Sequence, residues 1–392
     1  MAIRFPQEEF ARRLARVRKA ASNRGIDFMI VFSSPGSMRF GQRGHVLYLT
    51  GYEQYFGNSM LILPTDKGQE PLLQIDEANH FPSECTWVSN IQNPQDPVRT
   101  IGEYFRNLKA RKPSLVIVGE YSVNPKLLSR IEEMFATGVT YASDLLETER
   151  AVKSEHEIRC MKRSSAIAAK GFEAAARFIR PGVKDSEVVS EIERTCREAG
   201  SDDFPHRTMF SSGSDRSYLE WWWYCGRRTV KRGDCGTADF GTMFGAYCCD
   251  MARTFSLGSP SKAKKDIYDT IVEAEVAGQD AARAGALASE VDKAAAKVLR
   301  KFARYVTTGE TTDIGHGVGL EVHEWPFVGY HHIRNDETYV DRALKENMVI
   351  SIEPQIYHPD FGLMQIEDQF RVTKRGGEIL TDLPREIIEA GG

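Results

Sequence analysis

Apolar residues follow two different patterns in the first 150 residues of the chain: helical spacing and short continuous runs. Phe10, Leu14 and Val17 fall on one face of a predicted helix over 7–24, and Gly25 is suited to end it. Short continuous apolar runs predict buried strands, and further amphipathic stretches predict helices. The predicted strands cover 28–33, 46–52, 58–64, 71–76 and 114–120, and the other predicted helices cover 100–111 and 125–135. This alternation predicts an α/β layer domain, which we place at residues 1–152.

The remainder, residues 153–392, has a different pattern. Long helices are predicted at 153–180, 186–200, 263–285 and 288–303. Strands rich in glycine turns lie between and after them, so we expect an α+β domain with helices on one face of an antiparallel sheet. The pattern repeats loosely, because each half offers two helices and then a hairpin with two acidic residues. A chain of 392 residues is also longer than one hydrophobic core usually serves, which favours two domains.

Composition and charge exclude several classes of function. Hydrophobic residues make up 41% of the chain and charged residues 27%, and the net charge of −4 provides no basic field for nucleic acid or an anionic membrane. No apolar run is long enough to cross a bilayer, and MAIRFPQEEFARR lacks the apolar core of a signal peptide. Seven scattered cysteines are typical of reduced thiols, and the adjacent Cys248 and Cys249 are expected to pack rather than bind metal. We therefore expect a cytoplasmic protein without nucleic-acid or membrane partners.

Two pairs of acidic residues lie in predicted hairpins of the second domain. Asp239 ends one strand, and Asp250 lies on the returning strand after a glycine-rich turn. A single aspartate at a strand end is more often a turn former or a cap. Two facing carboxylates, however, repel each other unless a cation lies between them. The second pair is Glu353, after the apolar strand MVISI, and Glu367, after LMQI, where a buried glutamate is unfavourable without a partner.

His316 lies between glycines in DIGHGVGLEVHEWP, where the backbone can approach closely. Together with the four carboxylates it forms a donor set that suits a divalent ion such as Mn²⁺, Co²⁺ or Zn²⁺. His323 is a candidate for holding substrate or stabilising a tetrahedral intermediate. A lone histidine is more often a satisfied core residue, and this interpretation applies to the others: His45, His80, His156, His206, His331, His332 and His358.

These motifs together resemble the creatinase/prolidase/aminopeptidase P/methionine aminopeptidase superfamily, whose catalytic domain has the pita-bread fold. The matching stretches are GDCGTADFGTMFGAYCCDMARTFSLG, GHGVGLEVHEWP, ENMVISIEP and GLMQIED. RAVKSEHEI resembles the opening of that domain, and the part with VLYLTGY is similar to the extra N-terminal domain of the creatinase and prolidase branch. The resemblance covers nearly the whole chain. It implies an α/β N-terminal domain followed by an α+β pita-bread catalytic domain.

The resemblance also implies a ligand set for two divalent metal ions, which would be Mn, Co, Zn or Fe. Asp239 would bind one ion. Asp250 and Glu367 would bridge the two ions, and His316 and Glu353 would complete the shell. We expect this set to be the metal-binding part of the site.

The activity implied is hydrolysis of a C–N bond by metal-bound water, as in an Xaa-Pro dipeptidase or aminopeptidase, on a small amide or dipeptide-like substrate. Glu353 or Glu367 would take or pass a proton, and His323 would steady the carbonyl oxygen. Two departures concern the substrate. The histidine that most peptidase members place upstream of the GD motif is Trp222 here, and the arginine often found two residues before the last glutamate is Gln365.

These departures keep other functions open. Trp222 and Tyr224 share one face of a strand in EWWWYCGRR, so with His323 and Gln365 they are candidates to bind substrate, and aromatic rings suit an apolar or cationic molecule. The alternative is that the aromatic residues pack the sheet or a subunit contact. HEWPFVGY is similar to the dimethylsulfoniopropionate-lyase branch, although that branch alters the DFG motif kept here. A creatinase-like or lyase-like enzyme on a small metabolite is therefore an alternative, and a non-enzymatic binding module is a third class.

The resemblance finally implies a homodimer in which the N-terminal domain of one subunit borders the active site of the other. Residues in the loop-rich part of that domain are candidates to reach across: Arg43, His45, Tyr52 and Tyr55.

Overall fold

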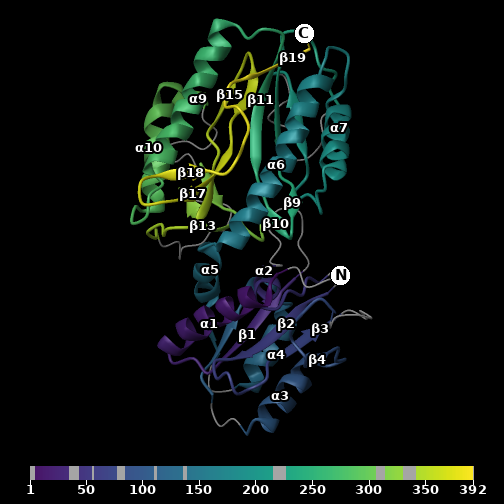
Figure 1. Cartoon of the computed structure of the whole chain (residues 1–392), viewed down its shortest axis with the longest axis vertical. Helices are drawn as coiled ribbons and strands as arrows, with labels where there is room; N and C mark the ends of the chain where they lie inside the picture. The colour runs from purple at the N-terminus through teal and green to yellow at the C-terminus, as the bar shows by residue number, and fades with distance from the viewer. Residues whose placement is uncertain are drawn as a thin grey trace. The chain divides into compact units, whose positions relative to one another are not determined.

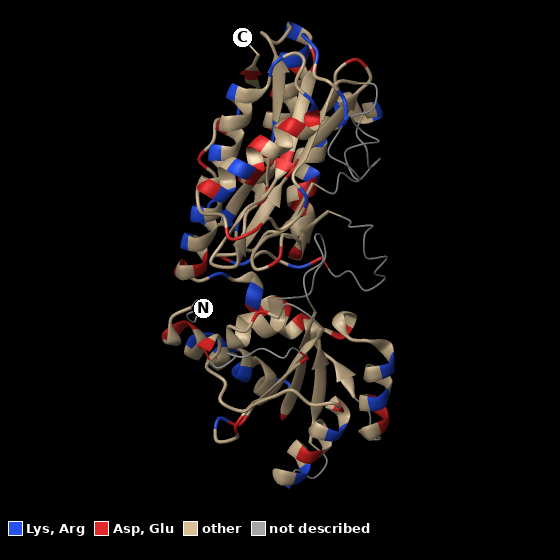
Figure 2. Ribbon diagram, turned by 90° about the vertical axis from the view of Figure 1, so that its right-hand side faces the viewer, with Lys and Arg blue, Asp and Glu red and all other residues tan. Residues whose placement is uncertain are grey.

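The computed structural model describes residues 5–34, 44–54, 57–76, 84–109, 113–135, 139–214, 227–305, 314–329 and 341–391. It divides into two compact units, Met1–Arg150 and Ala151–Gly392. Acidic and basic positions are interspersed along the helices of both units (Figure 2). Within the described ranges, no helix combines the length and apolar character needed to cross a membrane.

The N-terminal unit has a six-stranded sheet in the order β4-β3-β2-β1-β5-β6 (Figure 1). Strand β1 pairs antiparallel with β2 and parallel with β5, and all six of its residues are buried. Helices α3 and α4 pack on the face that carries Phe28, Ile30 and Phe32, and α2 packs against β1 with α1 beside it. The sheet is thus the mixed, covered sheet of an α/β domain. The elements are α1 (Gln7–Asn23), β1 (Phe28–Ser33), α2 (Gly44–Thr50), β2 (Ser59–Pro64), β3 (Leu72–Ile75), β4 (Ile91–Gln92), α3 (Pro97–Asn107), β5 (Leu115–Val118), η2 (Glu120–Ser122), α4 (Pro125–Met134), β6 (Thr140–Tyr141) and α5 (Ser143–Ala151).

One predicted strand of this unit is a helix. Most of the run 46–52 belongs to α2, in which every residue is buried. A short apolar run fits a buried helix as well as a buried strand, and tertiary packing decides between them. His45 and Tyr52 are each 1% exposed, so neither side chain is available to reach another subunit as expected. Arg43 and Tyr55 lie outside the described residues.

The C-terminal unit has two main sheets, each covered by its own pair of helices. The first has the order β19-β11-β8-β7 beneath α6 and α7, and the second has the order β13-β12-β14-β17-β18 beneath α9 and α10. Figure 1 shows the two helix pairs on opposite flanks of the strands. The elements are α6 (Glu155–Phe178), α7 (Asp185–Glu198), β7 (Met209–Ser212), β8 (Cys235–Phe240), β9 (Met243–Phe244), β10 (Tyr247–Cys248), β11 (Met251–Leu257), α9 (Lys262–Ala281), α10 (Ala288–Leu299), η3 (Arg300–Tyr305), β12 (Gly315–Gly317), β13 (Glu324–Val328), β14 (Val349–Ile352), β15 (Gln355–His358), β16 (Gly362–Gln365), β17 (Asp368–Val372), β18 (Gly377–Ile379) and β19 (Ile388–Ala390).

The four long helices predicted for this unit are confirmed, whereas the prediction of a single antiparallel sheet is wrong. Apolar periodicity predicts where strands occur, but it does not say which strands share hydrogen bonds. Each half of the unit buries its strands under a separate helix pair, so this unit has two main sheets.

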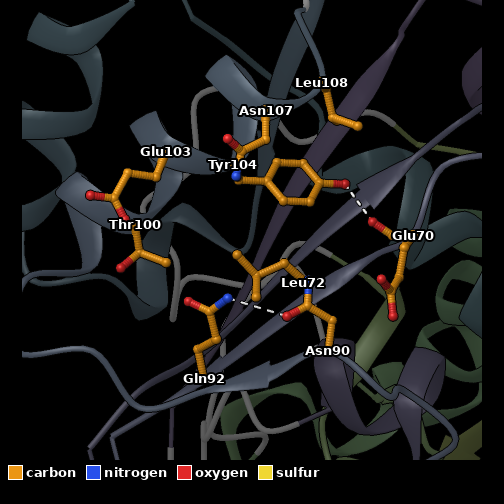
Figure 3. A pocket seen from close by; sticks show the side chains of 9 residues that line it. All are labelled: Glu70, Leu72, Asn90, Gln92, Thr100, Glu103, Tyr104, Asn107 and Leu108. Carbon is orange, nitrogen blue, oxygen red and sulfur yellow. Dashed lines mark hydrogen bonds between the residues drawn. The ribbon is translucent and has the colours of Figure 1, made fainter.

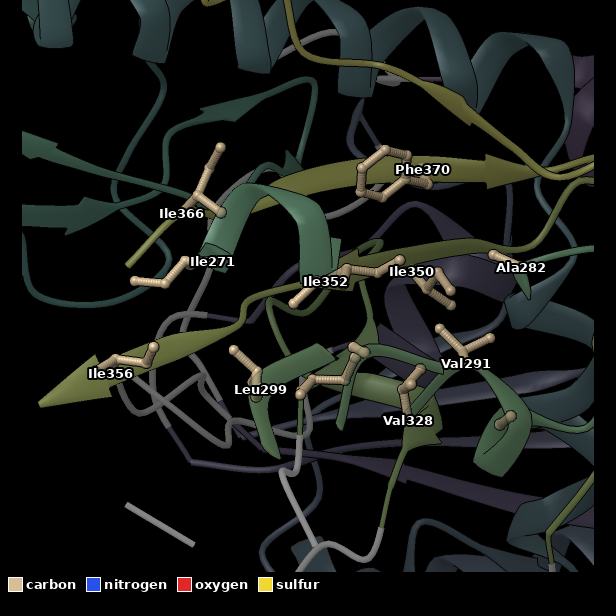
Figure 4. Close-up of a cluster of buried hydrophobic side chains, with 14 of the residues drawn as sticks. Ile271, Ala282, Val291, Leu299, Val328, Ile350, Ile352, Ile356, Ile366 and Phe370 are labelled. Carbon is tan, nitrogen blue, oxygen red and sulfur yellow. The ribbon is translucent and has the colours of Figure 1, made fainter. Parts of the chain in front are cut away.

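The core under α9 and α10 holds the second sheet in place (Figure 4). Ile271 and Val291 of these helices and Ile350, Ile352 and Phe370 of β14 and β17 are all 0% exposed. Each such side chain stabilises the fold by about 1.5–3 kcal/mol when buried. The packing therefore fixes β14, the strand that leads directly into one of the predicted metal ligands.

The two sheets meet at an isolated bridge between Ala252 and Glu367. The Glu367 amide donates to the Ala252 carbonyl at 3.0 Å. Arg253, which is fully buried, reinforces this junction: its Nη1 donates to the Glu367 carbonyl at 2.9 Å and its Nη2 to Asp368 Oδ1 at 2.8 Å. A predicted ligand thus lies where the two sheets join.

Candidate metal centre

The first acidic pair lies where β8 and β11 run side by side. Asp239 in β8 pairs with Ala252 in β11, and Asp250 lies one residue before β11 begins. The small hairpin of β9 and β10 occupies the intervening turn. A Cβ at Gly241 would lie 1.9 Å from the Cys249 carbonyl oxygen, so this close approach requires glycine. Asp239 and Asp250 are 7% and 4% exposed, which places two carboxylates in the interior.

The second pair flanks the hairpin of β15 and β16. Glu353 precedes β15 and Glu367 lies two residues after β16, so the hairpin register brings them to matching positions. His316 in β12 pairs with Ser351 in β14. At Gly315 a Cβ would lie 2.0 Å from the Ser351 carbonyl oxygen, so only glycine lets β12 approach β14 here.

These side chains converge on one point. The Nε2 of His316 lies 3.8 Å from Asp250 Oδ2, 3.5 Å from Glu353 Oε1 and 3.9 Å from Glu367 Oε1. Such separations exceed a hydrogen bond, but two ligand atoms that each lie about 2.1 Å from one ion are roughly 3–4.2 Å apart. Among the described residues, His316 Nε2 and Glu367 Oε2 are buried atoms without a hydrogen-bond partner. The residues present therefore fit a divalent cation.

Two further histidines lie at the same place. The ring of His323 is 3.9 Å from that of His316 between centroids. His206, which the sequence assigns to the core, has its Nε2 2.9 Å from Asp250 Oδ1 and 3.9 Å from Asp239 Oδ1. No glycine flank or local motif marks His206. Only the tertiary structure places His206 here, because His206 precedes β7 and β7 pairs with β8 beside Asp239.

The electrostatics of the cluster favour a cation. Burial, followed by the charges of Asp250 and Glu353, raises the pKa of Glu367 well above its ordinary value of 4.5. Burial lowers the pKa of His316. For His206, burial lowers the pKa, but Asp250 outweighs it and the net result is a pKa of about 9. Carboxylate oxygens with imidazole nitrogens suit Mn²⁺, Co²⁺, Zn²⁺ or Fe²⁺.

Of the residues predicted to bind substrate, the structure describes Gln365 but not Trp222 or Tyr224. Gln365 is 1% exposed, and its Nε2 donates to Glu353 Oε2 at 3.3 Å, so it contacts a predicted ligand. Trp222 and Tyr224 lie outside the described residues, as do His80, His331 and His332. Cys248 and Cys249 are fully buried, and in the part of the chain described no cysteine joins the groups able to hold a metal.

The N-terminal unit contains a cavity of about 250 Å³ with a different character (Figure 3). Its lining residues are Glu70, Leu72, Asn90, Gln92, Thr100, Glu103, Tyr104, Asn107 and Leu108. The Tyr104 hydroxyl donates to the Glu70 carbonyl at 2.6 Å. None of the metal-binding groups found among the described residues includes these side chains. The convergent chemistry therefore lies in the C-terminal unit.

Comparison with known proteins gives the same division. Residues 13–152 match the creatinase/prolidase N-terminal domain, and residues 159–374 match metallopeptidase family M24. An Xaa-Pro dipeptidase of Pyrococcus horikoshii is 31% identical over 93% of this chain and 95% of its own length. A putative dipeptidase of Bacillus subtilis is 32% identical over 88% of this chain and 93% of its own length.

Solved structures agree. An X-Pro aminopeptidase from Thermotoga maritima matches with a TM-score of 0.82 and 26% identity over 96% of this chain and 99% of that one. A prolidase from Pyrococcus horikoshii matches with a TM-score of 0.79 and 27% identity over 96% of this chain and 100% of that one. The expected α/β N-terminal domain and pita-bread catalytic domain are thereby confirmed. The chain belongs to metallopeptidase family M24, in the branch with a creatinase/prolidase N-terminal domain, and is a metal-dependent hydrolase of the dipeptidase and aminopeptidase type.

Proposed function

We propose that this protein hydrolyses the amide bond before proline in Xaa-Pro dipeptides. The observation that carries the proposal is the convergence of two acidic pairs and His316 at the junction of the two sheets. The relative from Pyrococcus horikoshii, named an Xaa-Pro dipeptidase and aligned over nearly the full length of both chains, supports the substrate class.

In this proposal Asp239, Asp250, His316, Glu353 and Glu367 hold two divalent ions. When bound, the ions supply an activated water and polarise the scissile carbonyl. Two donor groups that share Asp250 support a two-ion site: one contains Asp239, and the other contains His316.

The proton-transfer role falls to Glu353. Its side chain is 21% exposed whereas that of Glu367 is 1% exposed, so Glu353 is the acid that can meet substrate and exchange a proton with it. Gln365 orients Glu353 through its amide. His323, whose ring lies 3.9 Å from that of His316 between centroids, is positioned to donate a hydrogen bond to the carbonyl oxygen as charge develops there.

The test is a panel of Xaa-Pro dipeptides with matched Xaa-Ala controls, assayed on protein reloaded separately with Mn²⁺, Co²⁺, Zn²⁺ and Fe²⁺. We expect cleavage of Xaa-Pro substrates that a chelator abolishes and added metal restores. Protein with full metal content that cleaves no dipeptide on the panel would contradict the proposal.

One alternative has a specific observation in its favour. The side chain at 365 is a neutral amide bound to Glu353, where a peptidase often carries an arginine, and Trp222 occupies the position of a substrate-contacting histidine. Both changes favour a creatinase-like or lyase-like reaction on a small nitrogen- or sulfur-containing metabolite. Small amides and dimethylsulfoniopropionate therefore belong on the same panel.

The finer features of the proposal are domain limits at 1–152 and 153–392, manganese as the preferred ion, a cytoplasmic location and a homodimer. An oxygen-rich donor set favours manganese. The structure shows no disulfide between the cysteines that it describes, in keeping with a reducing compartment. Metal analysis of protein purified without chelator and light scattering of the purified chain test the ion and the dimer.

A further inference from the structure

His206 has the local geometry of a metal ligand, although it lies outside the five expected positions. It is 4% exposed and comes from the segment before β7. The pairing of β7 with β8 places Met209 opposite Asp239, which brings the preceding segment to the same edge. His206 is therefore presented to the first acidic pair by the sheet itself.

The hydrogen bond on the far side of the ring determines which nitrogen faces the acids. The Nδ1 of His206 lies 3.0 Å from the Arg207 carbonyl oxygen, which can only accept, so Nδ1 carries a proton. Nε2 is then the nitrogen that faces Asp250 and Asp239, and a bound cation would take the place of the proton that Nε2 shares with Asp250. His316 repeats this arrangement, with Nδ1 3.1 Å from the Gly317 carbonyl oxygen. A ring N–H that donates to a backbone carbonyl is the usual orientation device of a histidine that binds metal.

The distances distinguish a shared ion from a simple hydrogen bond. A hydrogen bond accounts for the 2.9 Å contact with Asp250 but not for the 3.9 Å approach to Asp239. One ion bound by all three side chains accounts for both distances, because ligand atoms around one ion lie roughly 3–4.2 Å apart. His206, Asp239 and Asp250 also form one of the groups whose ligand atoms all lie within 4.8 Å of one another.

We propose that His206 is a sixth metal ligand, which gives the ion at Asp239 and Asp250 a nitrogen donor of its own. The other ion keeps His316 as its imidazole. The centre would then carry one histidine on each ion. The nitrogen donor would let the site at Asp239 and Asp250 bind borderline metals such as Co²⁺ and Zn²⁺ more tightly than carboxylates alone allow. The inference rests on the metal centre of the proposed function, but not on its substrate.

The test is the proton NMR spectrum of the full chain loaded with Co²⁺, which shifts the exchangeable N–H proton of a ligating imidazole far outside the ordinary range. We expect at least two such lines in the wild type. His206→Gln should lose one line and keep the line that His316→Gln removes. His156→Gln, a change outside the cluster, should keep them all. We also expect the dissociation constant for one of the two Co²⁺ ions to rise at least about tenfold in His206→Gln.

If the wild type shows only one shifted exchangeable line, the inference is overturned before any variant is measured. An unchanged spectrum in folded His206→Gln would also overturn it. Failure to bind Co²⁺ at all would overturn the metal centre and this inference together. An expected set of lines in a protein that cleaves no Xaa-Pro dipeptide would refute only the proposed substrate.

Discussion

Asp250 is the residue through which the metal centre is best tested. It belongs to two of the three groups of potential ligands, one with His206 and Asp239 and one with His316 and His323. Asp250→Asn keeps the size of the side chain and a carbonyl oxygen, but it removes the negative charge. We expect this variant to lose most of the stabilisation that metal gives to the wild type.

The magnitude follows from binding linkage. An ion present at about 100 times its dissociation constant raises the free energy of unfolding by about 2.7 kcal/mol. For a domain as large as the C-terminal unit, each kcal/mol corresponds to roughly 2–4 °C in melting temperature. The wild type should therefore melt roughly 5–11 °C higher with metal than with chelator. In Asp250→Asn this difference should shrink to a small fraction of that value.

The assay is differential scanning fluorimetry with and without chelator, with metal content measured on the same samples. The matched control is Asp360→Asn in the turn between β15 and β16, where the aspartate side chain is 78% exposed. This control should keep the whole metal-dependent shift. A full shift in Asp250→Asn, with the wild-type metal content, would refute the placement of the site.

Two further predictions concern the buried charges behind the site. Burial, and then the Asp368 carboxylate, raises the pKa of Glu275 well above 4.5. Folding therefore takes up a proton between pH 4.5 and the native pKa, and the free energy of unfolding falls as pH rises through that window by up to about 1.4 kcal/mol per pH unit. Glu275→Gln removes this uptake, so the free energy of unfolding of the variant in urea should rise relative to that of the wild type as pH increases above about 5, and a difference that does not change with pH would contradict the assignment. Arg253→Ala leaves Asp368 buried without its fully buried partner and should cost about 3–5 kcal/mol of unfolding free energy. Arg253→Lys should recover part of that loss, and a cost below about 1 kcal/mol for the alanine variant would show that the pair does not hold the sheets together.

Much of the architecture could be predicted from local patterns. The helices of the C-terminal unit have apolar stripes that persist over many residues, and α6 begins with a capping box in which Ser154 and Glu157 each bind the backbone of the other. Such signals are local, so they survive without knowledge of partners. The run now in α2 carried no such signal, because its residues are buried on every side and show no period.

The amino-acid sequence by itself determined the kinds of residue available for chemistry. Its acidic pairs lie in two hairpins, and a hairpin is a local structure that brings its own two flanks together. The glycines beside His316 also act locally, because Gly315 lets β12 approach β14. These features made a metal site predictable before any fold was known.

Only the tertiary structure decided how the two hairpins meet and what joins them. The bridge between Ala252 and Glu367 and the buried contacts of Arg253 link strands that are more than 100 residues apart in the chain. His206 enters the cluster through the pairing of β7 with β8, which no local pattern encodes. The reason is physical: local periodicity records which face of an element is buried, whereas the register between distant strands depends on packing of the whole unit.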